Sequence, residues 1–315
     1  MRLFHGMRTL AMLFFPLIAF EMVWAAPPDP KLLSLVPPDT QLLAGACNQT
    51  HPGIPESFLL TGRYNLIDRR DFLSLAGVDD SMKIGQMIFA AGGSDARTWG
   101  EHSILASGIF NQERIYKSAV QNGATVTEFK GIRVLVQPPF ERELGTLKEV
   151  RWLAVLESKV ALFGTRSSVE LELLRYLARS AADPLLMQKV SRLRADNATW
   201  SVLGSFDIDN ELEQVFGSLD PVLANLIHDR KSFQFGVRYG KKIELEYDVV
   251  APSAAPAQSI SNFSGQSLVE GNGNGSSLLS RQDPAGLHGV VKLTTAQYKA
   301  WLAQCAQAAV LKSGN

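Results

Sequence analysis

Short runs in which apolar and polar residues alternate recur along this chain, and they are typical of strands that bury one face of a sheet. The clearest are two hairpins, at 125–136 and 233–250, which turn at Gly131 and Gly240. The alternation in the second hairpin predicts a sheet with one wetted side. The other predicted strands cover 40–47, 84–91, 103–110, 151–156, 160–164 and 290–293.

Helix starts are indicated by side chains that can accept hydrogen bonds from the unpaired amides of a first turn. Asn111 is expected to open a helix over 112–122, and Ser167 with Glu170 has the spacing of a capping box. Asp followed by Pro marks further starts, because proline at the first helical position loses no hydrogen bond. These signals predict further helices from Asp183-Pro184, Asp220-Pro221 and Thr294 with Gln297. A helix is also expected over 66–76, with acidic residues near its start and Gly77 as its C-terminal stop.

The order strand, helix, hairpin occurs twice, and each time the helix follows an aromatic residue and a capping side chain, Phe110-Asn111 and Phe206-Asp207. We therefore predict an α+β fold: a mainly antiparallel sheet with helices packed on one face, built from two related β-α-β-β units of ferredoxin-like order. The predicted divisions are an extended Pro-rich lead-in at 26–40, a first unit at 41–198, and a second at 199–315 that contains a flexible Ser/Gly/Asn-rich segment, 251–286.

With these helix openings and hairpins, the chain resembles uncharacterised exported bacterial proteins that have a signal segment followed by tandem strand-helix-hairpin units. The resemblance rests on Phe110-Asn111, Phe206-Asp207 and the two hairpins, which is about half of the chain. It implies an architecture and an exported location, and it implies no activity.

The first 25 residues have the pattern of a cleavable signal peptide. Arg2 and Arg8 precede an apolar run at 9–20, and Val23 and Ala25 place short side chains where a signal peptidase reads. An uncleaved anchor is the alternative, but the run of about a dozen residues is shorter than the ~20 that span a bilayer. We expect a soluble protein, periplasmic or extracellular, with no stable membrane span after cleavage.

Charge and cysteine content narrow the classes of partner. Cleavage after residue 25 removes two of 31 basic residues and one of 31 acidic residues, which leaves 29 against 30. A nearly neutral chain gains little from phosphate contacts, so nucleic acid is not an expected partner. Two cysteines, Cys47 and Cys305, exclude a disulfide scaffold, and whether these two pair is left open.

No motif for nucleophilic, metal or cofactor chemistry is present. The chain lacks Gly-x-Ser-x-Gly and the phosphate-binding glycine loops. Glu141 and Glu143 lie in a Pro-led loop typical of a solvated surface. The acidic cluster that starts at Asp207 has Leu212 where a calcium loop needs glycine. The remaining histidines are too scattered for a metal site: His51, His102, His228 and His288.

Two functional hypotheses follow. The leading one is a non-enzymatic binding or scaffolding protein of the cell envelope, with an unidentified protein or envelope partner, no cofactor, no metal and no assigned catalytic residue. The alternative is a secreted hydrolase whose site converges from scattered residues such as Ser167, His102 and Glu141.

Overall fold

The structure is a computed structural model that describes residues 28–47, 83–92, 101–137, 140–141, 148–195, 197–204, 232–250, 277–283, 286–301 and 303. Several sequence predictions lie outside these residues: the signal segment, the helix at 66–76, the acidic cluster at Asp207 and the helix start at Asp220-Pro221.

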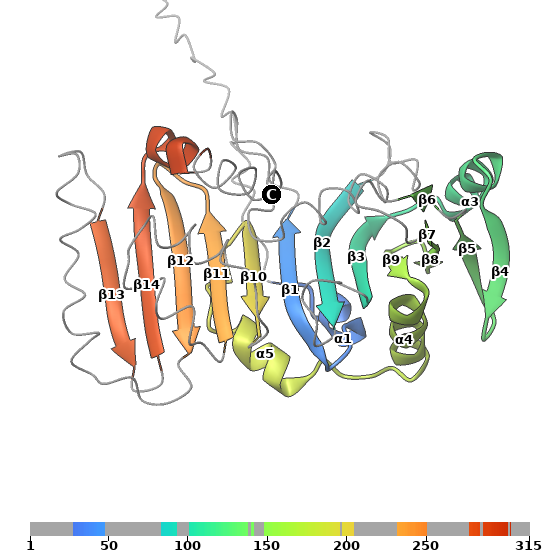
Figure 1. Ribbon diagram of the computed structural model, residues 1–315, viewed down its shortest axis with the longest axis horizontal. Coiled ribbons are helices and arrows are strands. Elements are labelled where there is room, and N and C mark those ends of the chain that lie inside the picture. Colours follow the sequence, from blue (N-terminus) through green and yellow to red (C-terminus); the bar gives the residue numbers. More distant parts are fainter. Residues whose placement is uncertain are drawn as a thin grey trace, which may run out of the picture.

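A single antiparallel sheet of 12 strands dominates the fold, and Figure 1 shows its strands side by side from β13 to β4. The order across the sheet is β13-β14-β12-β11-β10-β1-β2-β3-β9-β8-β5-β4, and β6 and β7 form a separate pair. The strands are β1 Thr40–Cys47, β2 Lys83–Gly92, β3 Glu101–Ile109, β4 Thr125–Phe129, β5 Ile132–Val136, β6 Phe140–Glu141, β7 Lys148–Glu149, β8 Arg151–Leu156, β9 Val160–Thr165, β10 Thr199–Leu203, β11 Ser232–Arg238, β12 Ile243–Val250, β13 Ser277–Asp283 and β14 Gly286–Leu293.

The described sheet is antiparallel and few helices accompany it, so the mainly antiparallel pairing predicted from the sequence is confirmed, and the arrangement is consistent with the α+β class. The predicted strands and both hairpins form as expected. At the first hairpin turn, Lys130 and Gly131 have φ of 49° and 85°, the left-handed values that a tight two-residue turn requires. The helices are α1 Pro30–Leu35, α3 Gln112–Gln121, α4 Arg166–Leu177 and α5 Pro184–Val190, and residues 295–301 are also helical.

Each face of the sheet carries an apolar core. Neighbouring residues of β1 point to opposite faces: Leu42 joins the core that contains Ile115 of α3, and Leu43 joins the core that contains Val169 of α4. We call these the α3 face and the α4 face. The α3 face also receives Trp301, and the α4 face also receives α1 and α5.

The prediction that helices pack on one face is therefore not confirmed. The sequence of β8, Arg-Trp-Leu-Ala-Val-Leu, is a continuous apolar run after its first residue, and all six of its residues are buried. A strand buried on both faces loses its alternation. Ferredoxin-like units are not confirmed either, because every strand pair of the described sheet is antiparallel, whereas a split β-α-β unit needs a parallel pair.

Two predicted divisions need correction. The lead-in at 26–40 is not wholly extended, because Asp29 accepts a hydrogen bond from the Lys31 amide at 2.9 Å and caps α1. Asp29-Pro30 is the same signal that correctly marks α5 at Asp183-Pro184, where Asp183 accepts from the Leu186 amide at 2.9 Å. The segment at 251–286 is not uniformly flexible, because β13 lies within it and pairs with β14.

The helix caps are confirmed with one exception. Asn111 accepts from the Arg114 amide at 3.0 Å, and Thr294 and Gln297 exchange the two hydrogen bonds of a capping box. The predicted capping box of Ser167 and Glu170 does not form, because the N-cap of α4 is Thr165. Glu170 instead forms an ion pair with Arg166 at 2.8 Å. Among the described residues, no helix has the length and apolar character needed to cross a membrane.

Candidate functional site

The structure does not bring together the residues that the hydrolase hypothesis names. His102 lies on β3 and is buried on the α3 face, with its ring centroid 6.1 Å from that of Phe89. Ser167 lies in the first turn of α4, on the opposite face of the sheet. Glu141 forms part of β6, while Glu143, His51, His228 and Cys305 lie outside the described residues.

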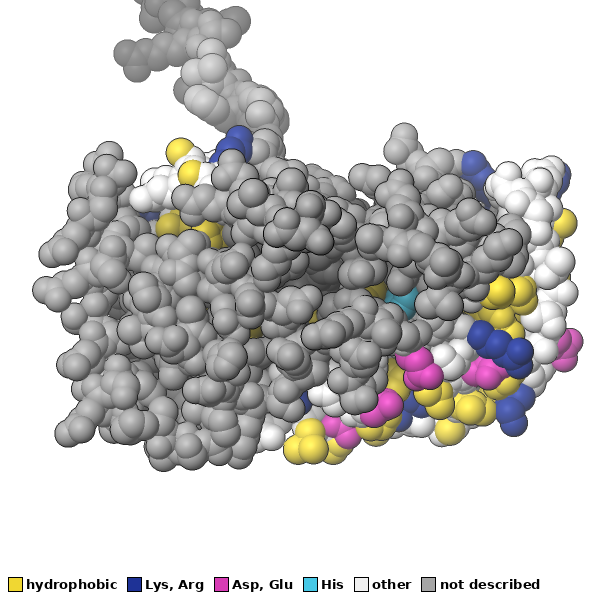
Figure 2. Space-filling view, viewed as in Figure 1, with side chains coloured by type: hydrophobic (Ala, Val, Ile, Leu, Met, Phe, Trp, Pro, Cys, Tyr) yellow, Lys and Arg dark blue, Asp and Glu magenta, His cyan; other side chains and the backbone are white. Residues whose placement is uncertain are grey.

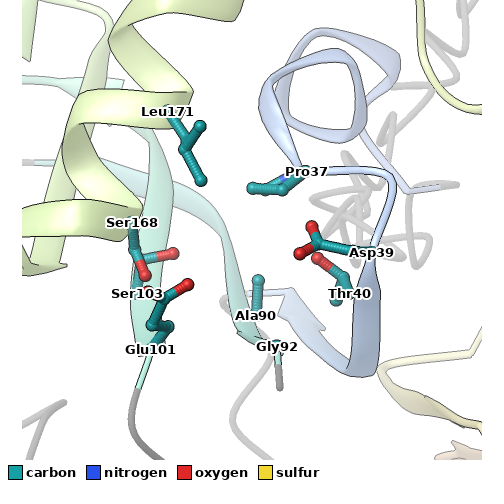
Figure 3. A pocket seen from close by; sticks show the side chains of 9 residues that line it. All are labelled: Pro37, Asp39, Thr40, Ala90, Gly92, Glu101, Ser103, Ser168 and Leu171. Carbon is teal, nitrogen blue, oxygen red and sulfur yellow. The ribbon is translucent and has the colours of Figure 1, made fainter. Parts of the chain in front are cut away.

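A small pocket on the α4 face is the best candidate site (Figure 3). It opens between α4 and the turn that joins α1 to β1. In the strand register, Thr40 pairs with Gly92 and Gly92 pairs with Glu101, so these three residues form one row across β1, β2 and β3. The pocket is lined by Pro37, Asp39, Thr40, Ala90, Gly92, Glu101, Ser103, Ser168 and Leu171.

Small residues on β2 create the hollow. Gly92 has no side chain and Ala90 has only a methyl group, so the centre of the row is lower than its two sides. A Cβ atom placed on Gly92 would lie 4.0 Å from Asp39 Oδ2, which is ordinary contact and would reduce the space. The cavity volume is about 10 Å³, which is room for about one water-sized group.

The lining is acidic and polar. Asp39 projects from the α1–β1 turn and Glu101 from β3, on opposite sides of the pocket (Figure 3). Hydroxyl groups of Thr40, Ser103 and Ser168 complete the polar surface, and no Lys, Arg or His is among the lining residues. No ion pair among the described residues neutralises Asp39 or Glu101.

A buried carboxyl group is hydrogen-bonded to one of the residues that line this pocket. Glu172 is fully buried on α4, one helical turn after Ser168, and its Oε1 accepts a hydrogen bond from Ser103 Oγ. Burial raises the pKa of Glu172 to about 8, and the Ser103 hydrogen bond opposes that shift. Glu172 Oε2 has no hydrogen-bond partner among the described residues. The group is therefore held mostly protonated at neutral pH.

Exposed leucines extend from the pocket along α4. Leu171 lines the pocket and is 41% exposed, and Leu174 and Leu177 follow at intervals of three residues with 39% and 44% exposed. Leu185, at the start of α5, is 67% exposed. Figure 2 shows hydrophobic, acidic and basic side chains intermixed over the region of α4 and α5. The pocket thus has an apolar rim.

A second polar cluster lies on β12, where Glu244, Glu246 and Asp248 alternate and point to the α4 face. Asp248 forms an ion pair with Arg192 at 2.5 Å, and Glu246 accepts from the Asn197 side chain at 2.7 Å. Glu244 pairs with three cations: Arg238, Arg194 at 3.2 Å and Lys292 at 3.2 Å. Every carboxylate of this β12 cluster therefore has a polar or cationic partner.

His288 joins this β12 cluster from the neighbouring strand β14. Its Nε2 lies 3.6 Å from Glu246 Oε1 and its Nδ1 lies 3.6 Å from Asp248 Oδ2. The hydrogen-bonding interaction with Asp248 is the main cause that raises the pKa of His288. Because the charges compensate one another within the fold, we interpret this cluster as structural.

The described residues contain no group of three or more His, Cys, Asp or Glu side chains that could hold a metal ion. Comparisons of the chain with models of protein families, with curated proteins and with solved structures found no match. The pocket is therefore argued from its own geometry.

Sequence reasoning missed the residues of this pocket. Glu172 carried a usable signal, because it shares the apolar face of α4 with Val169 and Leu173, where a charged residue is unexpected. Asp39 and Glu101 carried none. They lie far apart in the chain, and only the register of β1, β2 and β3 brings them together.

Proposed function

We propose that the chain is an exported, non-enzymatic binding protein that holds a cationic group of its partner in the pocket between α4 and the α1–β1 turn. One observation carries the proposal: Asp39 and Glu101 flank a cavity that no described cation fills. Two carboxylates that share a small space favour a positive ligand, because an opposite charge within a few ångströms relieves their repulsion.

The shape of the pocket favours a cationic head on an apolar stem. Pro37 and Leu171 form apolar walls beside the polar floor. A lysine side chain buries its methylene groups along such walls while its charged end meets the carboxylates. The exposed Leu174 and Leu177 continue the apolar surface away from the pocket. We therefore propose a polypeptide partner that presents a lysine beside apolar residues.

The hydrolase alternative has less support from the geometry. His102 and Ser167 lie on opposite faces of the sheet. Ser103 does contact a carboxyl group, but it is only 1% exposed, and the cavity has no room for a scissile bond and its substituents. Turnover of p-nitrophenyl butyrate by the purified protein, lost in Ser167→Ala, would favour the hydrolase.

Export remains part of the proposal and is supported by the signal pattern of residues 1–25. N-terminal sequencing of the protein from its native source tests it. The expected sequence starts near Ala26. A native protein that begins with Met1 and stays in the cytosol contradicts export without affecting the pocket.

We also propose that the two halves of the chain are related. Among the elements that the structure describes, helix, strand, strand, strand is the order of α1-β1-β2-β3 and of α5-β10-β11-β12, and both series extend outward from the central β1–β10 pair. Each series starts at an Asp-Pro helix cap, Asp29 or Asp183. This order supports an internal repeat whose units begin at these two residues.

Calorimetric titration with n-butylammonium, a lysine side-chain analogue, tests the binding proposal. The wild-type protein is expected to bind it saturably, and Asp39→Asn and Glu101→Gln are each expected to weaken binding about tenfold, or ~1.4 kcal/mol. Glu128→Gln is the matched control, because Glu128 is an exposed carboxylate on β4 outside the pocket. Equal affinities in all four proteins, or equal binding of butyrate, would contradict the proposal.

A further inference from the structure

We propose that ligand binding and proton release are coupled in this pocket. Entry of a primary ammonium group displaces the proton of Glu172. The inference rests on the proposed function, since it concerns the same pocket. It names the ligand class more narrowly and adds a property that simple binding to Asp39 and Glu101 does not have.

The geometry connects Glu172 to the pocket through one side chain. Ser103 lines the pocket and donates its hydroxyl hydrogen to Glu172 Oε1. Ser168, one turn before Glu172 on the same helix, lines the pocket as well and accepts a hydrogen bond from Thr165 Oγ1 at 3.0 Å. The carboxyl group is therefore joined to the lining of the cavity by the Ser103 hydroxyl group.

The described charged groups around Glu172 are engaged elsewhere or have the same sign. Arg166, at the start of α4, pairs with Glu170. Arg175 donates to the backbone oxygens of Ser34 at 3.0 Å and Ala181 at 2.7 Å. From β3 and the α1–β1 turn, the groups that face this region are the carboxylates of Glu101 and Asp39. No described cation is placed to stabilise an ionised Glu172.

A cation in the pocket changes this balance. An isolated carboxylate in an apolar site is costly, and the group remains neutral unless an opposite charge compensates it. An ammonium group in the cavity supplies that charge across a single hydroxyl group. Burial already keeps the pKa of Glu172 near 8, so a moderate stabilisation of the carboxylate is enough to ionise it at neutral pH. By reciprocity, ionisation of Glu172 strengthens ammonium binding.

The size of the cavity selects the ligand class. Room for about one water-sized group accepts an ammonium group, which has three donors for the surrounding hydroxyl and carboxylate oxygens. The planar guanidinium of arginine is larger and needs a fork of acceptors in one plane. The structure thus favours a lysine side chain or an alkylamine over arginine.

The proton balance is simple. Glu172 starts protonated and the ligand enters as a cation. The Oε–H bond of Glu172 breaks, its electron pair stays on the carboxylate, and the proton leaves to solvent or buffer. Ser103 keeps its own proton and donates it to the new carboxylate. The net result is one ligand bound and about one proton released at pH 7.

Titration calorimetry in buffers of different ionisation enthalpy measures this proton. We expect n-butylammonium binding at pH 7, compared in phosphate and in HEPES, neither of which is a primary amine, to release about one proton from the wild-type protein and none from Glu172→Gln. Wild-type affinity should rise about thirtyfold between pH 6 and pH 8, because release of nearly one proton makes the affinity almost proportional to the inverse proton concentration over most of this range. Glu170→Gln is the matched control, because Glu170 lies on the same helix outside the pocket, and it should release as many protons as the wild-type protein.

The outcomes separate the two proposals. Failure of n-butylammonium to bind the wild-type protein overturns the proposed function. Binding without proton release, with affinity independent of pH, overturns the coupling and leaves the binding site intact. The wild-type proton count decides the question even if Glu172→Gln fails to fold. If n-butylguanidinium binds as tightly as n-butylammonium, the proposed preference for a primary ammonium group is contradicted.

Discussion

Ser103 and Glu172 are 69 residues apart in the chain and are joined by a hydrogen bond between the sheet and α4. Both side chains are buried, and the remaining side-chain oxygen of the pair, Glu172 Oε2, has no hydrogen-bond partner among the described residues. Ser103 also lines the acidic pocket. The pair therefore connects the interior of the fold to the site at which we expect the ligand.

The free energy of unfolding should depend on pH through the titration of Glu172. Its pKa is about 8 in the folded protein and about 4.5 when exposed, so between these values the folded state holds a proton that the unfolded state has lost. The contribution of Glu172 is therefore greatest at low pH and falls by about 1.4 kcal/mol per pH unit as pH rises toward 8.

Urea unfolding of the wild-type protein and of Glu172→Gln at pH 5, 6, 7 and 8 measures this effect. The variant, which cannot ionise, should gain stability relative to the wild-type protein as pH rises. A difference in unfolding free energy that stays constant over this range would show that Glu172 titrates normally in the folded state.

Filling the pocket should block binding without unfolding the protein. In Gly92→Val the added Cβ meets no atom closer than 3.9 Å, and a β-branched residue suits a strand. We expect n-butylammonium binding to fall at least tenfold while the thermal unfolding midpoint changes by only a few degrees. Unchanged affinity would place the ligand outside this cavity.

His288 should make the β12–β14 pairing sensitive to pH. Its pKa is raised in the folded state, mainly by Asp248, so its contribution is complete below the unfolded pKa of about 6.5 and is lost as pH rises through the higher folded value. His288→Gln should therefore cost stability at pH 5.5 and little at pH 9. Chemical unfolding at these two values checks the sign, and an equal loss at both would show a purely packing role.

Gly164 should tolerate no side chain. A Cβ atom there would lie 2.6 Å from Ser103 Cα and would also contact the His102 backbone, and backbone atoms cannot rotate away. Gly164→Ala should destabilise the protein by roughly 2 kcal/mol or more. Gly85→Ala, whose Cβ would meet its nearest atom at 3.7 Å, is the control and should change stability far less.

The strands were predictable because their signals are local. Alternation in β11 and β12, and glycine at the turn between β4 and β5, depend on neighbouring residues alone. The same alternation misled in one respect. The alternating positions of Glu244, Glu246 and Asp248 predicted a solvent-exposed face. The segment that follows α5 in the chain, with Arg192, Arg194 and Asn197, lies across that face and holds the carboxylates in ion pairs and hydrogen bonds.

The site was not predictable because its residues meet through strand register. Asp39, Gly92 and Glu101 come from three elements, and each looks like an ordinary turn or strand-end residue in the sequence. Glu172 alone breaks a local rule, as a charged residue on the apolar face of α4. A buried acid without a predicted cation nearby is the kind of local conflict that points to a functional position.

The central proposal is that the acidic pocket binds a cation. Nuclear magnetic resonance titration with n-butylammonium tests it most directly. We predict saturable shift changes at the amides of Thr40, Gly92 and Glu101, and none at β12, where each carboxylate already has a partner. Shift changes confined to β12, or no saturable change at all, would contradict it.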